Sequence, residues 1–201
     1  FNQPYFKIFY SYANEDFTEL TEPQVLYNHD GNNTIDADIV YYNGLYHMFF
    51  KTEGQGNGIQ KATAKTLRGE WAPEYKYLQQ SKKAVEGSAV FKLIDSDEWI
   101  LMYDCYANGF YQFCKGDLKN FTYVKDTPTR GTFTPRHGSV MHITKAERER
   151  LEAWSDLNLA ISRVMRVPVT HISNEQIEAR KTLVEKANKV LATKSNAKDF
   201  R

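Results

Sequence analysis

The stretch Thr34–Lys51, TIDADIVYYNGLYHMFFK, decides the fold of this chain. Two runs rich in β-branched and aromatic residues flank Asn43-Gly44, and both of these turn residues tolerate positive φ. A two-residue turn there predicts an antiparallel hairpin in which Tyr42 pairs with Leu45, with the pairing continuing outward along both strands. The chain is therefore expected to be built from short antiparallel strands.

The start of this hairpin carries two acids where strands rarely have them. Asp36 and Asp38 are two positions apart, so regular alternation would place both carboxylates on one face of the first strand. Aspartate is disfavoured in strands, and two like charges on one face repel each other. One interpretation is a solvated strand edge, and the other is a functional site at the mouth of a β-structure.

Composition narrows the classes of protein. The net charge is +1, which gives no bulk electrostatic reason to expect a nucleic-acid or membrane-surface partner. Aromatic residues make up 14%, which favours sheets or a carbohydrate-facing surface, because sugar rings stack on aromatic faces. The chain opens on Phe1 rather than Met, which is consistent with a processed or truncated start. Cys105, predicted opposite Gln112 across a turn at Asn108-Gly109, and Cys114 are expected to be free thiols.

The hairpin belongs to a repeated pattern of short strands. Residues 5–28, 35–79 and 86–124 each give apolar or aromatic strands separated by polar turns, and two of these passes begin 50 residues apart, at Ile35 and Val85. A period of four short strands is typical of propeller blades, although a solenoid or a sandwich would show similar periodicity. About three blades fit into residues 1–143, which we interpret as one domain, a partial β-propeller in an all-β fold.

The pattern changes after Gly138. Residues 139–143 read as one more strand, and Thr144 to Glu147 form a capping box that opens a helix running to about Ser155. A second helix is predicted over roughly 174–193, where apolar residues recur at helical spacing on a narrow stripe. Residues 144–201 are therefore predicted to be a helical C-terminal segment and tail that packs on a partner surface or another domain.

Three short motifs at near-equal intervals resemble one enzyme family. Thr-Ile-Asp-Ala-Asp-Ile contains Asp36, Val-Glu-Gly contains Glu86, and Pro-Arg-His-Gly contains His137, each at a strand start. Together with Met-Tyr-Asp-Cys-Tyr, these stretches resemble glycoside hydrolase family 43, whose five-bladed β-propellers cleave arabinose- and xylose-containing polymers. The resemblance runs from about residue 5 to residue 154.

The resemblance implies roles for four residues. Glu86 matches the general acid, and Asp36 matches the aspartate that tunes and orients it. His137 matches a histidine near the propeller axis that often holds a calcium ion, directly or through water, and Arg136 is a candidate sugar contact. The chemistry agrees, because a neighbouring carboxylate raises the pKa of an acid catalyst through like-charge repulsion. An inverting glycosidase also needs an ionised carboxylate to activate water, roughly 6.5–9.5 Å from the acid.

The chain departs from the family pattern at the general base. In the family this base is an aspartate of the first blade, usually followed by proline, and no Asp-Pro dipeptide occurs here. We therefore expect the later blades of a propeller, whose open wall would be covered by the missing blades, by self-association or by the C-terminal helix.

Further residues complete the predicted site. Asp38 competes with Asp36 for its role and is a candidate substrate contact, and Tyr106 and Phe133 could form a sugar platform. Lys51 and Glu53 could reach sugar hydroxyls, but we favour a solvated loop for them. The expected function is inverting hydrolysis of arabinose- or xylose-containing plant polysaccharides or oligosaccharides, with no organic cofactor. The alternatives are a non-catalytic carbohydrate-binding or structural propeller piece, and a related glycosidase acting on fructans or mannosides. Family resemblance further implies a secreted or periplasmic protein.

Overall fold

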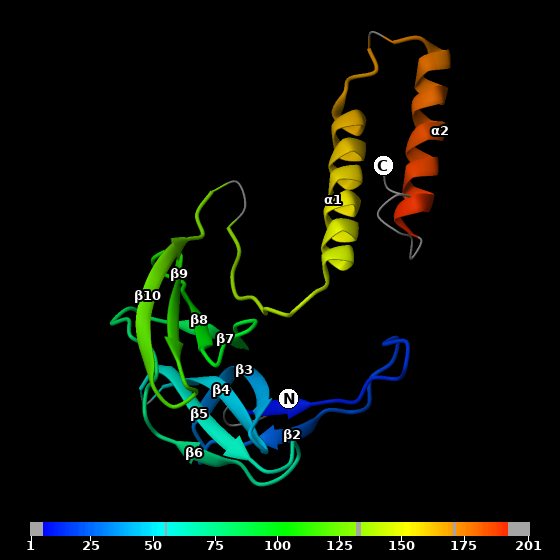
Figure 1. Cartoon of the computed structure of the whole chain (residues 1–201). Helices are drawn as coiled ribbons and strands as arrows, with labels where there is room; N and C mark the ends of the chain where they lie inside the picture. Colours follow the sequence, from blue (N-terminus) through cyan, green and yellow to red (C-terminus); the bar gives the residue numbers. More distant parts are fainter. Residues whose placement is uncertain (1–5, 55, 132–133, 171, 193–201) are drawn as a thin grey trace. The chain divides into compact units, whose positions relative to one another are not determined.

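The computed structural model of the chain describes residues 6–54, 56–131, 134–170 and 172–192. These residues form two compact units, 1–141 and 142–201, which we describe separately. Figure 1 follows the order of the elements: β1 (Ile8–Tyr10), β2 (Gln24–Tyr27), β3 (Asn33–Tyr42), β4 (Leu45–Glu53), β5 (Gly58–Ala64), β6 (Ala72–Glu74), β7 (Glu86–Lys92), β8 (Trp99–Cys105), β9 (Phe110–Gly116), β10 (Phe121–Pro128), α1 (Lys145–Arg166) and α2 (Asn174–Leu191).

The first unit is a partial β-propeller. Two four-stranded antiparallel sheets have the strand orders β3-β4-β5-β6 and β7-β8-β9-β10, so each sheet is a simple up-and-down meander like a propeller blade. A third sheet has only two strands, β1 and β2. The predicted all-β partial propeller with a helical C-terminal segment is therefore confirmed. Two of the three sheets in the described residues have the four strands of a blade.

A shared core joins the two four-stranded blades. Phe49 and Ile59 of the first blade belong to one buried cluster with Leu101 and Tyr103 of the second. All four side chains are fully buried. Every residue of β8 is buried, so this strand lies in the interior with both faces covered. The first strands of the two blades, β3 and β7, contact each other. Packing between the blades therefore holds these two strands side by side.

Both first strands contain a β-bulge near their start. In the β3–β4 ladder, Ile35 pairs with Lys51 and Asp38 with Phe49, so two residues of β3 face one residue of β4. The β7–β8 ladder is interrupted in the same way between Glu86 and Ala89. A bulge bends the strand and re-aims a side chain. The blades therefore repeat a local irregularity as well as a strand order.

Three sequence predictions of secondary structure are corrected. Residues 139–143 form no strand, and the chain runs across them without regular structure. Helix α1 continues to Arg166 rather than ending near Ser155, because apolar residues keep recurring at helical spacing and no proline lies between Ser155 and Pro168. The loop before β9 spans four residues, so Cys105 pairs with Phe110 and not with Gln112. Both cysteines are free and buried, as expected.

The second unit is a helical hairpin. Capping boxes at Thr144 and Ser173 open α1 and α2, and both helices begin where the sequence predicts. Arg180 of α2 donates to the carbonyl oxygens of Met165 and Val167 at 2.7 Å, and this closes the end of the hairpin where α1 stops. Neither helix of the described residues is long and apolar enough to cross a membrane.

Candidate active site

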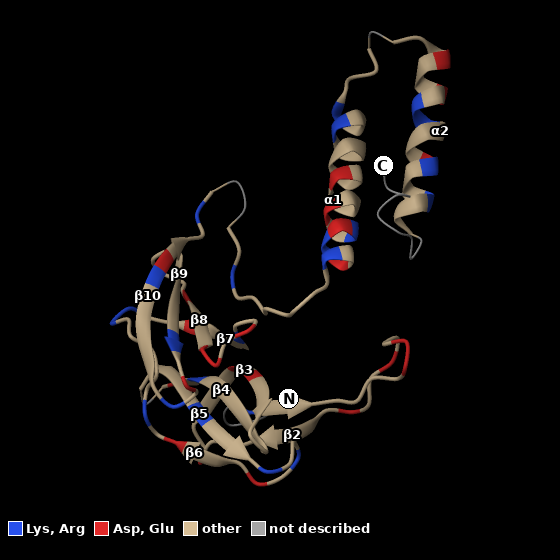
Figure 2. Cartoon of the chain, viewed as in Figure 1, with Lys and Arg blue, Asp and Glu red and all other residues tan. Residues whose placement is uncertain are grey.

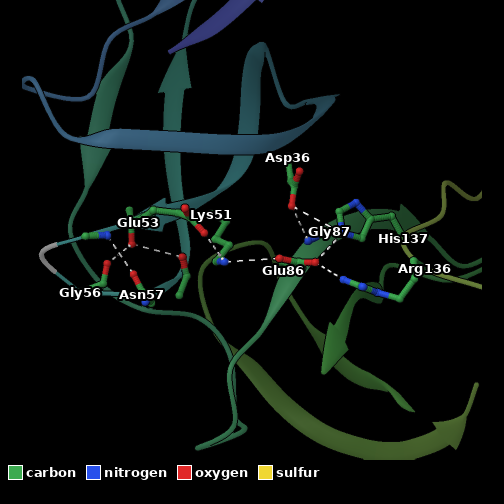
Figure 3. A network of polar contacts seen from close by, with 12 residues as sticks. Asp36, Lys51, Glu53, Gly56, Asn57, Glu86, Gly87, Arg136 and His137 are labelled. Carbon is green, nitrogen blue, oxygen red and sulfur yellow. Dashed lines mark hydrogen bonds and ion pairs between the residues drawn. The ribbon is translucent and has the colours of Figure 1, made fainter. Parts of the chain in front are cut away.

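The bulges bring the three predicted motifs to one place. Asp36, Glu86 and His137 each offer a ligand or proton-binding atom, and these atoms lie within 4.8 Å of one another. The Oδ2 atom of Asp36 accepts a hydrogen bond from the backbone N–H of Gly87 at 3.0 Å. Figure 3 shows these side chains pointing toward one another from the two blades and from the segment that follows the second blade.

The register corrects how the motifs align. Because Ile35 pairs with β4 as Glu86 pairs with β8, the structural equivalent of Asp36 is Gly87 and not Glu86. Asp36 (φ 55°), Gly87 (φ 59°) and His137 (φ 56°) all have positive φ, whereas Glu86 does not. Asp36 therefore lies inside the bulge of its blade, whereas Glu86 lies directly before the bulge of the next blade.

His137 stands between the two acids. Its Nε2 atom lies 3.1 Å from Glu86 Oε1 and 3.7 Å from Asp36 Oδ2. The Tyr111 hydroxyl donates to the His137 carbonyl oxygen at 2.8 Å, which holds the backbone of this segment. The histidine ring also packs against Gly87, where no side chain is present.

Gly87→Ala tests this close approach. A Cβ atom at Gly87 would lie 2.5 Å from Cδ2 and 2.6 Å from Cγ of the His137 ring. We expect the substitution to destabilise the fold by more than the roughly 1–2 kcal/mol of an alanine in the left-handed region, and to displace the imidazole. Urea unfolding and the NMR resonances of His137 measure the two effects.

Gly44→Ala is the matched control for this substitution. Gly44 has φ +78°, and no atom lies within 4 Å of a Cβ placed there, so the control carries the backbone strain without the clash. If Gly87→Ala costs no more than Gly44→Ala and leaves the His137 resonances unmoved, the packing of the ring on Gly87 is wrong.

Two cations hold Glu86 from opposite sides. Lys51 Nζ lies 3.4 Å from Glu86 Oε2, and Arg136 Nη2 donates to Glu86 Oε1. Burial opposes ionisation of Glu86, but the hydrogen bond from His137 and the charges of Lys51 and Arg136 outweigh it, so the pKa of this carboxyl lies below its usual value. In this state Glu86 is a carboxylate.

Lys51 corrects the prediction of a solvated loop. Its side chain is 3% exposed, and its Nζ donates to Glu53 Oε1 at 2.6 Å. Its charge also lies 5.3 Å from the centre of the Tyr106 ring. A buried lysine at the end of an apolar strand needs a carboxylate partner. The signal in the sequence was the hairpin register, which places Lys51 beside the Asp36 end of the first strand.

Asp104 is a site residue that sequence reasoning missed. It is fully buried in β8, directly opposite Glu86 in the ladder, and its Oδ2 accepts a hydrogen bond from Arg136 Nε. Arg136 thereby bridges Glu86 and Asp104. The available signal was an aspartate inside the apolar run Trp99–Cys105, because a carboxylate among buried residues requires a charged or hydrogen-bonding partner.

The remaining predicted contacts fall in different places. Asp38 Oδ2 accepts from the Val90 backbone N–H at 2.6 Å, and burial raises the pKa of Asp38 above its usual value. The Tyr106 ring is partly exposed beside the site, with the Arg136 guanidinium 5.4 Å from its centre. Phe133 lies outside the described residues. Sugar contacts by Arg136, Asp38, Tyr106 and Phe133 therefore stay predictions.

The donor set does not fit a calcium ion bound directly by side chains. Calcium takes six to eight oxygen ligands, whereas this cluster consists of two carboxylates and one imidazole, which offers nitrogen. Both oxygens of Glu86 already face Lys51 or Arg136, whose charges repel a cation. Binding through water at His137 stays a prediction, and we route no chemical step through calcium.

Chelation tests the calcium prediction. We expect removal of calcium with EGTA to change the melting temperature by no more than about 1 °C, because a metal stabilises a fold only where the folded state binds it. Differential scanning calorimetry in EGTA and in excess calcium measures this. A fall of several degrees in EGTA that calcium reverses would show that the cluster, or water around it, does bind the ion.

Comparisons with known proteins agree with the motifs. The model of a family described as "probable glycosyl hydrolase domain", related to glycoside hydrolase family 43, matches residues 1–149. A comparison with curated proteins finds no match.

Solved structures of two family 43 enzymes show local similarity. One is an exo-β-1,3-galactanase from Phanerochaete chrysosporium with galactose, at 20% identity and a TM-score of 0.41, covering 48% of this chain and 25% of that chain. The other is a β-1,3-galactosidase with galactodeoxynojirimycin, at 14% identity and a TM-score of 0.38, covering 58% of this chain and 36% of that one. The chain thus spans about a quarter to a third of the length of these structures. The family model, matched over residues 1–149, shows that this chain belongs to the family of "probable glycosyl hydrolase" domains related to glycoside hydrolase family 43.

Proposed function

We propose that this chain carries the acid half of an inverting glycosidase that acts on arabinose- or xylose-containing polysaccharides or oligosaccharides. The observation that carries the proposal is the convergence of Asp36, Glu86 and His137 from three successive segments within 4.8 Å. Glu86, when protonated, would donate its proton to the glycosidic oxygen as the bond to the sugar breaks. The pentose specificity rests on the family resemblance.

Asp36 fits the role of a tuning partner better than that of the base. Its oxygen lies within 4.8 Å of Glu86, which is closer than the roughly 6.5–9.5 Å that separates acid and base in inverting enzymes. A water molecule and a sugar ring do not fit between groups at that separation. Asp36 is therefore not assigned as the general base.

Arg136 must leave Glu86 before Glu86 can act as an acid. The guanidinium stabilises the carboxylate, whereas a general acid has to carry a proton when substrate is bound. The Arg136 side chain is 47% exposed, so its Nη2 can turn from Glu86 toward a bound sugar while its Nε stays on Asp104, and Lys51, at 3% exposed, is held in place. In this proposal the substrate hydroxyls accept the hydrogen bond that Arg136 otherwise donates to Glu86, and Glu86 is then free to bind a proton.

A second candidate function is a non-catalytic carbohydrate-binding module. The specific observation in its favour is that Glu86 is held ionised by Lys51, Arg136 and His137, as a structural or ligand-binding carboxylate would be. The Tyr106 ring beside Arg136 would then stack on a sugar without any bond being cleaved.

Product analysis on defined oligosaccharides separates these candidates. The protein is incubated with α-L-arabinofuranosyl, β-xylosyl, β-1,3-galactosyl, fructosyl and mannosyl oligosaccharides, and NMR follows both the released sugar and its anomer. Release of pentose with inversion supports the proposal. Binding without release supports the second candidate, and release from only one of the other sugars overturns the pentose specificity.

The stereochemical outcome tests the role of Asp36 separately. Retention of configuration would make Asp36 a nucleophile, because retaining enzymes place their two carboxyl groups about 5–5.5 Å apart. A secreted or periplasmic location, which the family resemblance implies, is part of the same proposal and is checked by fractionating the source cells.

A further inference from the structure

The helical hairpin leaves an apolar groove along one side. The groove has a volume of about 460 Å³ and is lined mainly by aliphatic side chains of both helices: Leu157, Ile161, Val164, Ala179, Leu183 and Ala187. Leu183 is 66% exposed and Val164 is 43% exposed. Among the described helical residues only Ala153 is buried, so the two helices cover little of each other's apolar surface. A surface of this kind is stabilised by a covering partner.

The rim of the groove indicates which partner fits. At 100° per residue, Asp156 and Arg163 lie on the same outer edge of α1, one turn before and one turn after Ala160. A twofold axis between residues 159 and 160 would pair α1 with an antiparallel copy of itself. Asp156 would then face Arg163 of the second copy, and Arg163 would face Asp156 of the second copy. The small side chain of Ala160 at the centre allows the two backbones to approach.

Helix α2 has the same polarity. Glu175 lies in its first turn and Lys189 in its last turn. An antiparallel copy of α2 therefore also brings opposite charges together, and Figure 2 shows the basic end of α1 and the mixed charges along both helices. The charge pattern is self-complementary in one orientation, and this is the property that an interface between two identical chains requires.

We propose that this groove binds a second copy of the chain, so that two hairpins form an antiparallel four-helix bundle. In this bundle, Leu183 and Val164 of each copy fill the groove of the other, with the charged pairs at the rim. The dimer is held by the second unit, and it requires no contribution from the propeller blades and no enzymatic activity.

Analytical ultracentrifugation of the full 201-residue chain tests the proposal. From about 1 to 100 µM we expect a concentration-dependent dimer. Leu183→Glu places a carboxylate in the apolar groove and should raise the dissociation constant at least about tenfold. Leu151→Glu is the matched control, because Leu151 is also exposed but does not line the groove. It should leave the dimer unchanged.

Exchanging the two charges distinguishes a specific interface from nonspecific association. Asp156→Arg and Arg163→Asp should each weaken the dimer, because like charges then face each other across the twofold axis, and the double variant should restore it. Circular dichroism confirms that each variant keeps its helices. A chain that stays monomeric throughout the range, whether the groove is open or covered by another part of the same chain, overturns the proposal. Equal weakening by Leu183→Glu and Leu151→Glu, or no restoration in the double variant, also overturns it.

Discussion

Glu86→Gln is expected to lower kcat/KM by about 10²–10⁴-fold on oligosaccharides whose leaving group is an unactivated sugar hydroxyl. The amide keeps the shape of the side chain, and its single carbonyl oxygen can still accept a hydrogen bond from either Lys51 or Arg136, but it cannot donate an acidic proton to the glycosidic oxygen. The loss should be far smaller on aryl glycosides, because a good leaving group departs without protonation. Comparing the two substrate classes separates loss of acid catalysis from loss of binding.

The control for this prediction is Glu98→Gln. Glu98 is an exposed glutamate that pairs with Lys115 at 2.9 Å on the surface of the second blade, and its replacement should leave kcat/KM unchanged on both substrate classes. An equal loss on good and poor leaving groups would contradict an acid role for Glu86. A wild-type protein as inactive as the variant would favour the carbohydrate-binding candidate.

The pH dependence follows from the same contacts. An acid catalyst works only when it is protonated, so kcat/KM should fall as pH rises through the pKa of Glu86 in the free protein. Lys51, Arg136 and His137 hold that pKa below its usual value, so the fall should begin at more acidic pH than for an unperturbed glutamate. Glu86→Gln should remove this limb of the profile.

Local sequence signals predicted the hairpin correctly. The Asn43-Gly44 turn set the register, and the observed pairs Tyr42–Leu45 and Val40–His47 are those that a two-residue turn requires. Turn chemistry and capping act over a few residues, so the sequence of those residues is enough to predict them. The same reasoning explains why both helix starts were located correctly.

The errors fall where distant residues decide the geometry. A one-residue bulge cannot be read from the alternation of β3, because the alternation breaks only where Asp36 turns to meet the Gly87 amide of the next blade. Lys51 was placed in solvent because only one of its two carboxylate partners, Glu53, is close in sequence, whereas the other, Glu86, lies 35 residues away. Residues 139–143 have strand-like composition, but a strand also needs a neighbour with free backbone groups.

Phe49→Ala is expected to destabilise the first unit by about 3–5 kcal/mol, a large share of the stability of an ordinary domain. Phe49 is fully buried in β4, and its ring meets Phe121 of the second blade edge-on, with the centroids 6.1 Å apart. The cavity left by alanine would lie between the blades. The measured change should be a lower denaturant midpoint with an unchanged slope.

Phe17→Ala makes the same chemical change where no core is present. Phe17 is 82% exposed, so its replacement should alter the free energy of unfolding by no more than about 0.5 kcal/mol. Because the packing between the blades also sets the distance from Asp36 to the Gly87 amide, Phe49→Ala should increase hydrogen exchange at that amide below the unfolding midpoint. A midpoint shift without faster exchange at Gly87 would mean that the bulge of β3 holds the acids together without help from the core. A site supported by interblade packing requires both changes to occur together.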